Sequence, residues 1–238
     1  MFETAKAISA ILEKEQDKDI LLLLAGGSAF SVYDAILPQW ISSHVTIAMT
    51  DDRFSRDMDV NNSHILQATD FYNECINADA YYISTEVWNE EKPEELAKRF
   101  EYGLRQWREE FPKGVVIAIF GIGEDGHTCG MIPCAGKSAE DAKFIGKSDD
   151  KEKTFSELFE NEGKWVVGYT TPNNEYAERI TITMPFIRNN VDYAVAFISG
   201  EKKHEVFDRL IADKGSLDLT PARILRELKN VEIFTDII

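Results

Sequence analysis

The sequence predicts an α/β protein whose mostly parallel sheet is covered by helices on both faces. Apolar runs typical of buried strands alternate with amphipathic helical segments almost throughout the 238 residues. The run 115–120 is apolar and rich in β-branched side chains, as expected of a strand covered on both faces. Because no internal repeat, low-complexity tract or linker divides the sequence, we expect one domain spanning residues 1–238.

Local signals place the elements of the first half of the chain. Ser28 can cap a helix that ends near Ile36, ahead of Pro38. One face of the segment 93–111 is apolar at helical spacing, with Leu96, Phe100, Leu104 and Trp107. We expect helices at 2–17, 28–36, 61–71 and 93–111, and strands at 19–25, 44–49 and 115–120.

The second half continues the alternation after one polar stretch. Residues 135–162 are rich in Lys, Asp and Glu, and we expect them to form a surface insertion with a short helix. The remaining expected elements are strands at 165–169, 179–184, 193–199 and 231–234, and helices at 201–211 and 221–228.

Composition restricts the class of protein. The net charge of −16 argues against a nucleic-acid partner, although a small phosphorylated ligand responds to local cations rather than to net charge. The N-terminus lacks a signal-peptide pattern, and no apolar stretch approaches the roughly 20 residues that span a membrane. Three cysteines without metal-ligand spacing indicate reduced thiols. We therefore expect a cytoplasmic protein without a nucleic-acid or membrane partner; a monomer and a homodimer both fit.

The most informative segment is Gly121-Ile-Gly-Glu-Asp-Gly-His-Thr128, which follows the strand at 115–120. Its three glycines let the backbone turn sharply and come close to a ligand. Asp125 and His127 stand two residues apart at the carboxyl end of that strand, where α/β sheets bind ligands. His127 is therefore a candidate catalytic residue. Cys129 offers an alternative nucleophile, although no second histidine is placed to activate it.

Two turns at other strand ends supply further candidates. The backbone N–H groups of Gly26, Gly27 and Ser28, with the dipole of the following helix, could bind an anion, or the turn could simply cap that helix. Asp51 and Arg53 follow the strand at 44–49, where a charged surface cluster is the alternative.

Two cations stand near other strand ends. Arg179 opens an alternating strand and Lys203 follows a buried one, so both could reach the same phosphate or remain solvated. The other histidines, His44, His64 and His204, share no metal-binding spacing with His127, so we expect no metal site.

These segments together resemble the 6-phosphogluconolactonase family, within the group that also contains glucosamine-6-phosphate deaminases. The resemblance covers nearly the whole chain, in order, through Ala25-Gly-Gly-Ser28, Asp51-Asp-Arg53 with Asn61-Asn62, Gly121-Ile-Gly-Glu-Asp-Gly-His-Thr128, Arg179-Ile-Thr-Ile-Thr-Met-Pro185, Gly200-Glu-Lys-Lys203 and Leu219-Thr-Pro-Ala-Arg-Ile-Leu225. Two departures stand out: Ala25 replaces a serine, and Asp52 replaces a glutamate whose side chain could orient Arg53.

The resemblance implies a Rossmann-like three-layer sandwich without a redox cofactor. It implies hydrolysis of 6-phospho-D-glucono-1,5-lactone to 6-phosphogluconate in the pentose phosphate pathway, with His127 as the base that activates water. Asp125 or Asp51 would then hold the imidazole or the sugar hydroxyls. The phosphosugar would be bound by Gly26, Gly27, Ser28, Arg53, Arg179 and Lys203.

Two alternatives remain open. Deaminases of the group follow Asp-Gly-His with Ile-Ala-Phe-Asn-Glu, whose glutamate helps to open the sugar ring. The fifth residue after His127 is Ile132 here, which cannot transfer a proton. A non-catalytic sugar-phosphate sensor on the same fold is the other alternative, because fold alone does not secure function.

Overall fold

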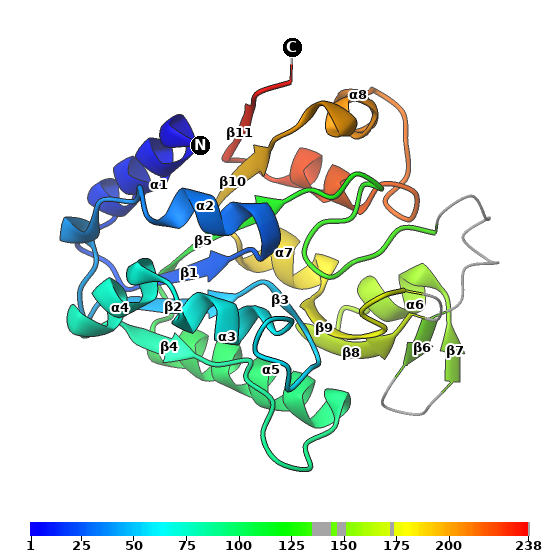
Figure 1. Ribbon diagram of the computed structural model, residues 1–238, viewed down its shortest axis with the longest axis horizontal. Coiled ribbons are helices and arrows are strands. Elements are labelled where there is room, and N and C mark those ends of the chain that lie inside the picture. The colour runs from blue at the N-terminus through cyan, green and yellow to red at the C-terminus, as the bar shows by residue number, and fades with distance from the viewer. Residues whose placement is uncertain (135–143, 147–150, 172–173, 238) are drawn as a thin grey trace.

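A six-stranded parallel sheet forms the centre of the computed structural model, which describes residues 1–134, 144–146, 151–171 and 174–237 (Figure 1). Its strands lie in the order β11-β10-β5-β1-β2-β4, and each neighbouring pair is parallel. The bounds are β1 Ile20–Leu24, β2 Val45–Met49, β4 Tyr81–Ile83, β5 Val115–Gly121, β10 Tyr193–Ile198 and β11 Val231–Thr235. The predicted mostly parallel central sheet is confirmed.

Alternate side chains of the central strands enter two separate cores, which gives the protein three layers. Leu21 and Leu23 of β1 pack on the side of α5 and α7, whereas Leu22 packs on the side of α1 and α2. Figure 1 shows the helices on both sides of the sheet. Their bounds are α1 Phe2–Lys14, α2 Phe30–Tyr33, α3 Asn62–Gln67, α4 Asp70–Asn77, α5 Pro93–Glu110 and α7 Met184–Asn190. The three-layer α/β fold is thus confirmed.

A second, antiparallel sheet of five strands extends the molecule and was not predicted. Its order is β3-β9-β8-β6-β7. The strands expected at 165–169 and 179–184 exist as β8 and β9, but they belong to this second sheet. The bounds are β3 Asp51–Arg53, β6 Phe144–Gly146, β7 Lys151–Lys153, β8 Val166–Thr170 and β9 Glu178–Ile182.

The segment expected to be a surface insertion is in part built into this second sheet. It supplies β6, β7 and the expected short helix, α6 (Phe155–Phe159). Four of its apolar side chains are buried in the core: Phe144, Phe155, Leu158 and Phe159. The expected surface position is therefore wrong for these four residues. Their apolar side chains, spaced among polar neighbours in the sequence, are the ones that enter the core. Residues 135–143 and 147–150 of the expected insertion lie outside the described residues.

Several element boundaries differ from those expected, for local reasons. The helix expected at 61–71 is two helices, because the Thr69 side chain caps α4 by accepting the N–H of Tyr72. Residues 183–184, expected to end a strand, instead start α7, where Thr183 is the cap and Pro185 stands in the first turn. Ser28 lies in a 3₁₀ turn (η1, Gly27–Ala29) ahead of α2, which has only four residues.

The C-terminal third completes the fold with short helices. A 3₁₀ turn (η3, Glu201–Lys203) leads into α8 (His204–Ile211), and the expected helix at 221–228 is a 3₁₀ helix (η4, Pro221–Glu227). In the part of the chain that the structure describes, none of the helices combines the length and apolarity needed to cross a membrane.

Candidate active site

The carboxyl ends of the central strands surround one polar pocket of about 170 Å³. The turn after β1, the loop after β5 and the turn after β10 contribute its walls, and β3, α3 and β9 complete them. Its lining residues include Gly26, Gly27, Ser28, Asp51, Arg53, His127, Arg179 and Lys203. The structure therefore brings together the site residues expected from sequence, and Asp125 joins them through a direct contact with His127.

Asp125 holds the imidazole of His127. The Asp125 Oδ1 atom lies 2.6 Å from His127 Nδ1 and also accepts the His127 backbone N–H at 3.0 Å. Burial raises the pKa of Asp125, but the hydrogen bonds and charge of His127 outweigh this, so that the carboxyl pKa lies below its ordinary value. An ionised carboxylate only accepts hydrogen bonds, so in the neutral imidazole the ring proton is assigned to Nδ1 and Nε2 is the proton acceptor.

The glycine-rich loop places the imidazole directly over its own backbone. A Cβ atom on Gly123 would lie 2.1 Å from His127 Cε1, so only glycine allows this ring position. The loop is closed by the Gly123 N–H donating to the His127 carbonyl at 2.9 Å, and by Thr128 Oγ1 donating to the Gly121 carbonyl at 2.9 Å. The Gly-x-Gly-x-Asp-Gly-His-Thr order thus fixes a loop geometry that presents His127 to the pocket.

Asp51 is a buried acid in the pocket wall, 6% exposed. Burial raises its pKa above the ordinary value, while the charges of Arg179 and Arg53 act in the opposite direction. Its Oδ1 accepts a hydrogen bond from Thr50 Oγ1 at 3.1 Å. Of the two acids expected to hold the imidazole, Asp125 makes that hydrogen bond, and Asp51 faces the pocket itself.

Three cations surround the pocket. Arg53 and Arg179 are direct cross-strand partners between β3 and β9, an arrangement in which two like charges repel each other unless an anion binds between them. Burial lowers the pKa of Lys203, since desolvation disfavours its charged form. Within the described residues, none of the three forms a salt bridge with a carboxylate. Their positive charge is thus available to an anionic ligand.

Local contacts hold the two arginines in place. Arg179 donates to the Tyr176 carbonyl at 3.0 Å and to Asn174 Oδ1 at 3.1 Å. The Arg53 guanidinium donates to the Val60 carbonyl at 3.3 Å and lies 4.7 Å from the centre of the Tyr176 ring. The guanidinium groups are therefore ordered before a ligand arrives.

The glycine turn after β1 offers backbone N–H groups to the same pocket. Gly27 has φ +65°, a conformation that favours glycine, and the buried Tyr33 hydroxyl donates to the Ala25 carbonyl at 2.6 Å. Because α2 is only four residues long, the expected helix dipole adds little here, and the N–H groups themselves remain the anion-binding feature.

Comparison with known proteins identifies the family. A family model described as glucosamine-6-phosphate isomerases/6-phosphogluconolactonase matches residues 2–234. The chain belongs to this family. No curated protein matches the chain by sequence.

Solved structures of the family share the fold at low sequence identity. A 6-phosphogluconolactonase from Plasmodium vivax is 17% identical with a TM-score of 0.72, over 98% of this chain and 85% of that one. One from Shewanella baltica is 20% identical with a TM-score of 0.66, over 98% and 91%. A monomeric glucosamine-6-phosphate deaminase is 16% identical with a TM-score of 0.63, over 99% and 94%. Both activities of the family thus occur on this fold, and only the site can distinguish them.

Two residues support the site from outside the pocket in ways that the sequence did not indicate. Asp52 does not orient Arg53: its carboxylate accepts the backbone N–H groups of Asn62 at 2.6 Å and Ser63 at 3.0 Å. Arg209 of α8 donates to the carbonyls of Asp125 at 3.2 Å and Glu124 at 3.5 Å, and so holds the loop of His127. No local sequence signal marks either role, since each depends on distant partners.

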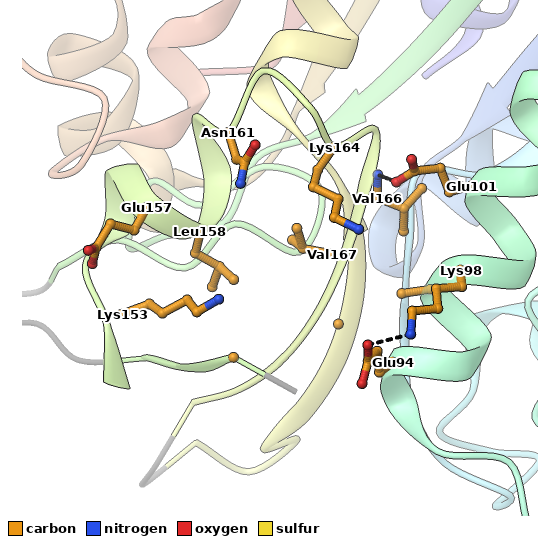
Figure 2. Close-up of a pocket in the computed structure, with 13 residues that line it drawn as sticks. Glu94, Lys98, Glu101, Lys153, Glu157, Leu158, Asn161, Lys164, Val166 and Val167 are labelled. Atoms are coloured by element: carbon orange, nitrogen blue, oxygen red, sulfur yellow. Dashed lines mark hydrogen bonds and ion pairs between the residues drawn. The ribbon is translucent and has the colours of Figure 1, made fainter. Parts of the chain in front are cut away.

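A second pocket, of about 70 Å³, lies between α5, β8 and α6 (Figure 2). Several of its charged groups make contacts within the fold. Lys98 forms an ion pair with Glu94 at 2.6 Å, and Glu101 accepts the N–H groups of Trp165 and Val166, each at 3.0 Å. It contains neither histidine nor cysteine among its described lining residues, so we regard it as a less suitable site for catalysis.

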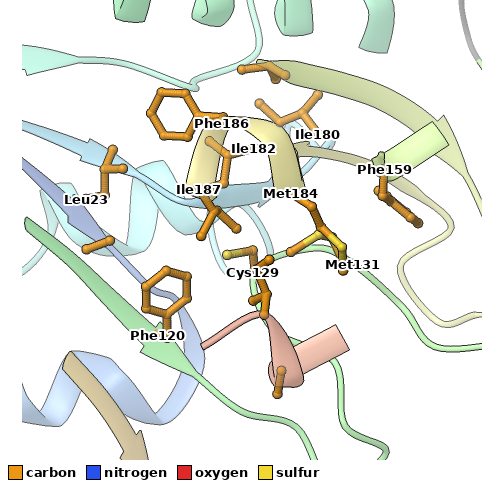
Figure 3. Close-up of a cluster of buried hydrophobic side chains, with 14 of the residues drawn as sticks. Leu23, Phe120, Cys129, Met131, Phe159, Ile180, Ile182, Met184, Phe186 and Ile187 are labelled. Carbon is orange, nitrogen blue, oxygen red and sulfur yellow. The ribbon is translucent and has the colours of Figure 1, made fainter. Parts of the chain in front are cut away.

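The alternative nucleophile Cys129 lines the pocket but is only 7% exposed, and its side chain belongs to the apolar core (Figure 3). Figure 3 shows it beside Met131 and among side chains of β9 and α7. Burial raises the pKa of its thiol well above the ordinary value. Because only the thiolate is nucleophilic, these surroundings argue against a reactive Cys129. Over the described ranges, no three His, Cys, Asp or Glu side chains are grouped as metal ligands would be.

Proposed function

We propose that this protein hydrolyses 6-phospho-D-glucono-1,5-lactone to 6-phosphogluconate. The observation that carries the proposal is an imidazole with Nδ1 bound to Asp125, in a pocket that also contains Arg53, Arg179 and Lys203. Lactone hydrolysis requires a base for water and a cationic site for the phosphate. The pocket offers both within one small volume.

In the proposed reaction, His127 Nε2 takes a proton from water as the water oxygen attacks the lactone carbonyl carbon, C1. The ionised Asp125 stabilises the imidazolium that forms. The tetrahedral intermediate then collapses: the bond from C1 to the ring oxygen breaks, and that oxygen receives the proton from the imidazolium. The product is 6-phosphogluconate, and His127 returns to its starting state.

The Arg53 guanidinium at the pocket wall can stabilise the oxyanion of the intermediate. The backbone N–H groups of Gly123, Gly126 and His127 already donate hydrogen bonds within the 121–127 loop. Arg179, Lys203 and the turn at 26–28 are assigned to the phosphate. A hydrogen bond to a charged group contributes about 1.5–3 kcal/mol, enough for several such contacts to fix C1 beside His127.

Deamination of glucosamine 6-phosphate is the second candidate. Asp51 favours it, since a buried carboxyl with a raised pKa is suited to moving a proton between sugar carbons. Ile132 argues against it, because this side chain packs against the hydrophobic core and no carboxylate stands at that position. We therefore prefer the lactonase.

The test is lactone hydrolysis by the purified protein, followed with an excess of coupling dehydrogenase and corrected for spontaneous ring opening. We expect turnover without added metal or nucleotide, and faster hydrolysis of the phosphorylated lactone than of unphosphorylated gluconolactone. Deamination of glucosamine 6-phosphate faster than lactone opening would overturn the proposal. Loss of activity with a chelator, restored by a divalent ion, would overturn its metal-free part.

A further inference from the structure

Asp52 is a fully buried carboxylate between two pocket residues, and the proposed chemistry does not use it. It is 0% exposed. In a strand, successive side chains point to opposite faces. Asp51 and Arg53 of β3 line the pocket, and Asp52 points the other way, toward α3 and the segment after β4.

The Asp52 carboxylate has three hydrogen-bond donors. Oδ1 accepts the Asn62 N–H at 2.6 Å, and Oδ2 accepts the Ser63 N–H at 3.0 Å and the Thr85 hydroxyl at 2.6 Å. The first two donors belong to the first turn of α3, where backbone N–H groups have no acceptor within the helix. Asp52 therefore fixes the start of α3 against β3.

The start of α3 in turn holds both neighbours of Asp52. The Asn62 side chain donates to the Asp51 carbonyl at 3.3 Å, and the Asn61 side chain donates to the Arg53 carbonyl at 3.2 Å. The Val60 carbonyl accepts from the Arg53 guanidinium. The segment 60–63 thus touches the backbone of each pocket residue of β3.

Asn62 also packs against the glycine turn. A Cβ atom on Gly26 would lie 2.5 Å from the Asn62 amide atoms, so the turn packs directly against this side chain. Asn62 is 2% exposed, and its Oδ1 is a buried atom without a hydrogen-bond partner among the described residues. Because the Asn62 side chain makes few hydrogen bonds, its position depends on the Asn62 backbone, whose N–H group is bound by Asp52.

We propose that Asp52 is a positioning residue of the pocket: through the N–H groups of Asn62 and Ser63, it sets the spacing between the glycine turn and the pocket face of β3. The identity of the phosphosugar rests on the proposed function, whereas this spacing does not. We expect substitution of Asp52 both to weaken ligand binding and to make the backbone of the glycine turn more mobile.

A purely structural role would lower stability and leave the pocket intact, so the test needs a matched control. Glu101 provides one, because its carboxylate also accepts two consecutive backbone N–H groups, those of Trp165 and Val166, away from the His127 pocket. The substitutions are Asp52→Asn and Asp52→Glu, compared with Glu101→Gln. Thr85→Val removes only the third donor and serves as the milder variant if the others do not fold.

Three readouts apply to each variant: thermal stability, KM and kcat for the lactone with the dissociation constant of 6-phosphogluconate, and hydrogen exchange of the amides at 25–30. We expect the Asp52 variants to raise KM and the dissociation constant roughly tenfold, with a smaller change in kcat, and to speed exchange at 25–30. Glu101→Gln should lower stability and change neither binding nor exchange there. Asp52 variants that match this control in binding and exchange would overturn the proposal.

The exchange measurement keeps the two proposals separable. If the wild type does not hydrolyse the lactone, the proposed function fails, and exchange at 25–30 still decides whether Asp52 positions the turn. If the wild type is active and exchange in the Asp52 variants is unchanged, the positioning role fails alone.

Discussion

At the scale of single residues, His127 is the group on which the proposed chemistry depends most. His127→Asn is expected to fold normally, because the residue lies on a partly exposed loop and little core packing is lost. Removing a general base typically costs 10²- to 10⁴-fold in turnover, and we expect a loss of kcat in that range. The measurement is kcat and KM for the lactone, with thermal stability as the check on folding.

Cys129→Ala is the matched control for this prediction, since Cys129 lies two residues away and faces the same pocket. We expect this variant to keep most of its turnover, because a buried, protonated thiol takes no part in the reaction. Near wild-type turnover in His127→Asn, together with inactive Cys129→Ala, would transfer the reactive role to the thiol.

The sequence predicts the local part of the site better than the supporting part. Asp125 and His127 belong to one loop, so their contact follows from their spacing. Asp52 takes its bonds from Asn62 and Thr85, which are 10 and 33 residues away. A contact of that kind depends on how the elements pack, and the charged triplet at 51–53 therefore resembles an ordinary surface cluster in the sequence.

At the scale of elements, length and pattern decide what is predictable. The long amphipathic α5 and the buried strand β5 are present close to their expected bounds. The strands β3 and β4 have three residues each, too few for a periodic signal. β3 is also polar, and its existence depends on pairing with β9, more than 120 positions later in the chain. The second sheet could not be predicted for that reason.

The position of α8 leads to an element-scale prediction, since this helix links two parts of the site. Lys203 precedes it, and Arg209 on it donates to the carbonyls of Glu124 and Asp125. Arg209→Ala removes these two hydrogen bonds and so makes the loop that positions the His127 imidazole more mobile. Because misplacing a base weakens catalysis more than binding, we expect kcat to fall about tenfold or more with a small change in KM.

Arg226→Ala is the control for that prediction. Arg226 donates to the Ile211 carbonyl at 2.7 Å, at the far end of α8, and has no contact with the His127 loop among the described residues. We expect it to lower stability without changing kcat. Equal kcat values for the two variants would show that α8 stabilises the fold without orienting the loop.

At the scale of the whole molecule, net charge and local charge differ in sign. The chain carries −16, while the pocket gathers Arg53, Arg179 and Lys203. Long-range repulsion of an anionic substrate is screened over about 8–10 Å at physiological salt, whereas contacts inside the pocket are not. The negative net charge of the chain therefore does not argue against a small phosphorylated ligand. The expected cytoplasmic location and the monomer or homodimer state remain predictions.

Buried carboxyls make the stability of the molecule depend on pH. Burial raises the pKa of Asp52 from 3.8 to about 7, against the effect of its three hydrogen-bond donors, and the charge of Asp51 raises it further. Burial also raises the pKa of the adjacent Tyr82 hydroxyl, which stays neutral. The pKa of Asp52 is higher in the folded state than in the unfolded state. Asp52 therefore makes its full contribution to the free energy of unfolding below about pH 4, and this contribution is lost as the pH rises to about 7.

The Asp52→Asn variant isolates this effect, because asparagine does not ionise. We expect the free energy of unfolding of the wild type, relative to Asp52→Asn, to fall by up to about 1.4 kcal/mol for each pH unit between 5.5 and 7, and to level off above that. Urea unfolding of both proteins at several pH values from 5.5 to 8.5 measures the difference. A difference independent of pH would mean that Asp52 stays ionised throughout, because its three donors outweigh burial and keep its pKa low. Asp52 would then fix the start of α3 as a permanent anion.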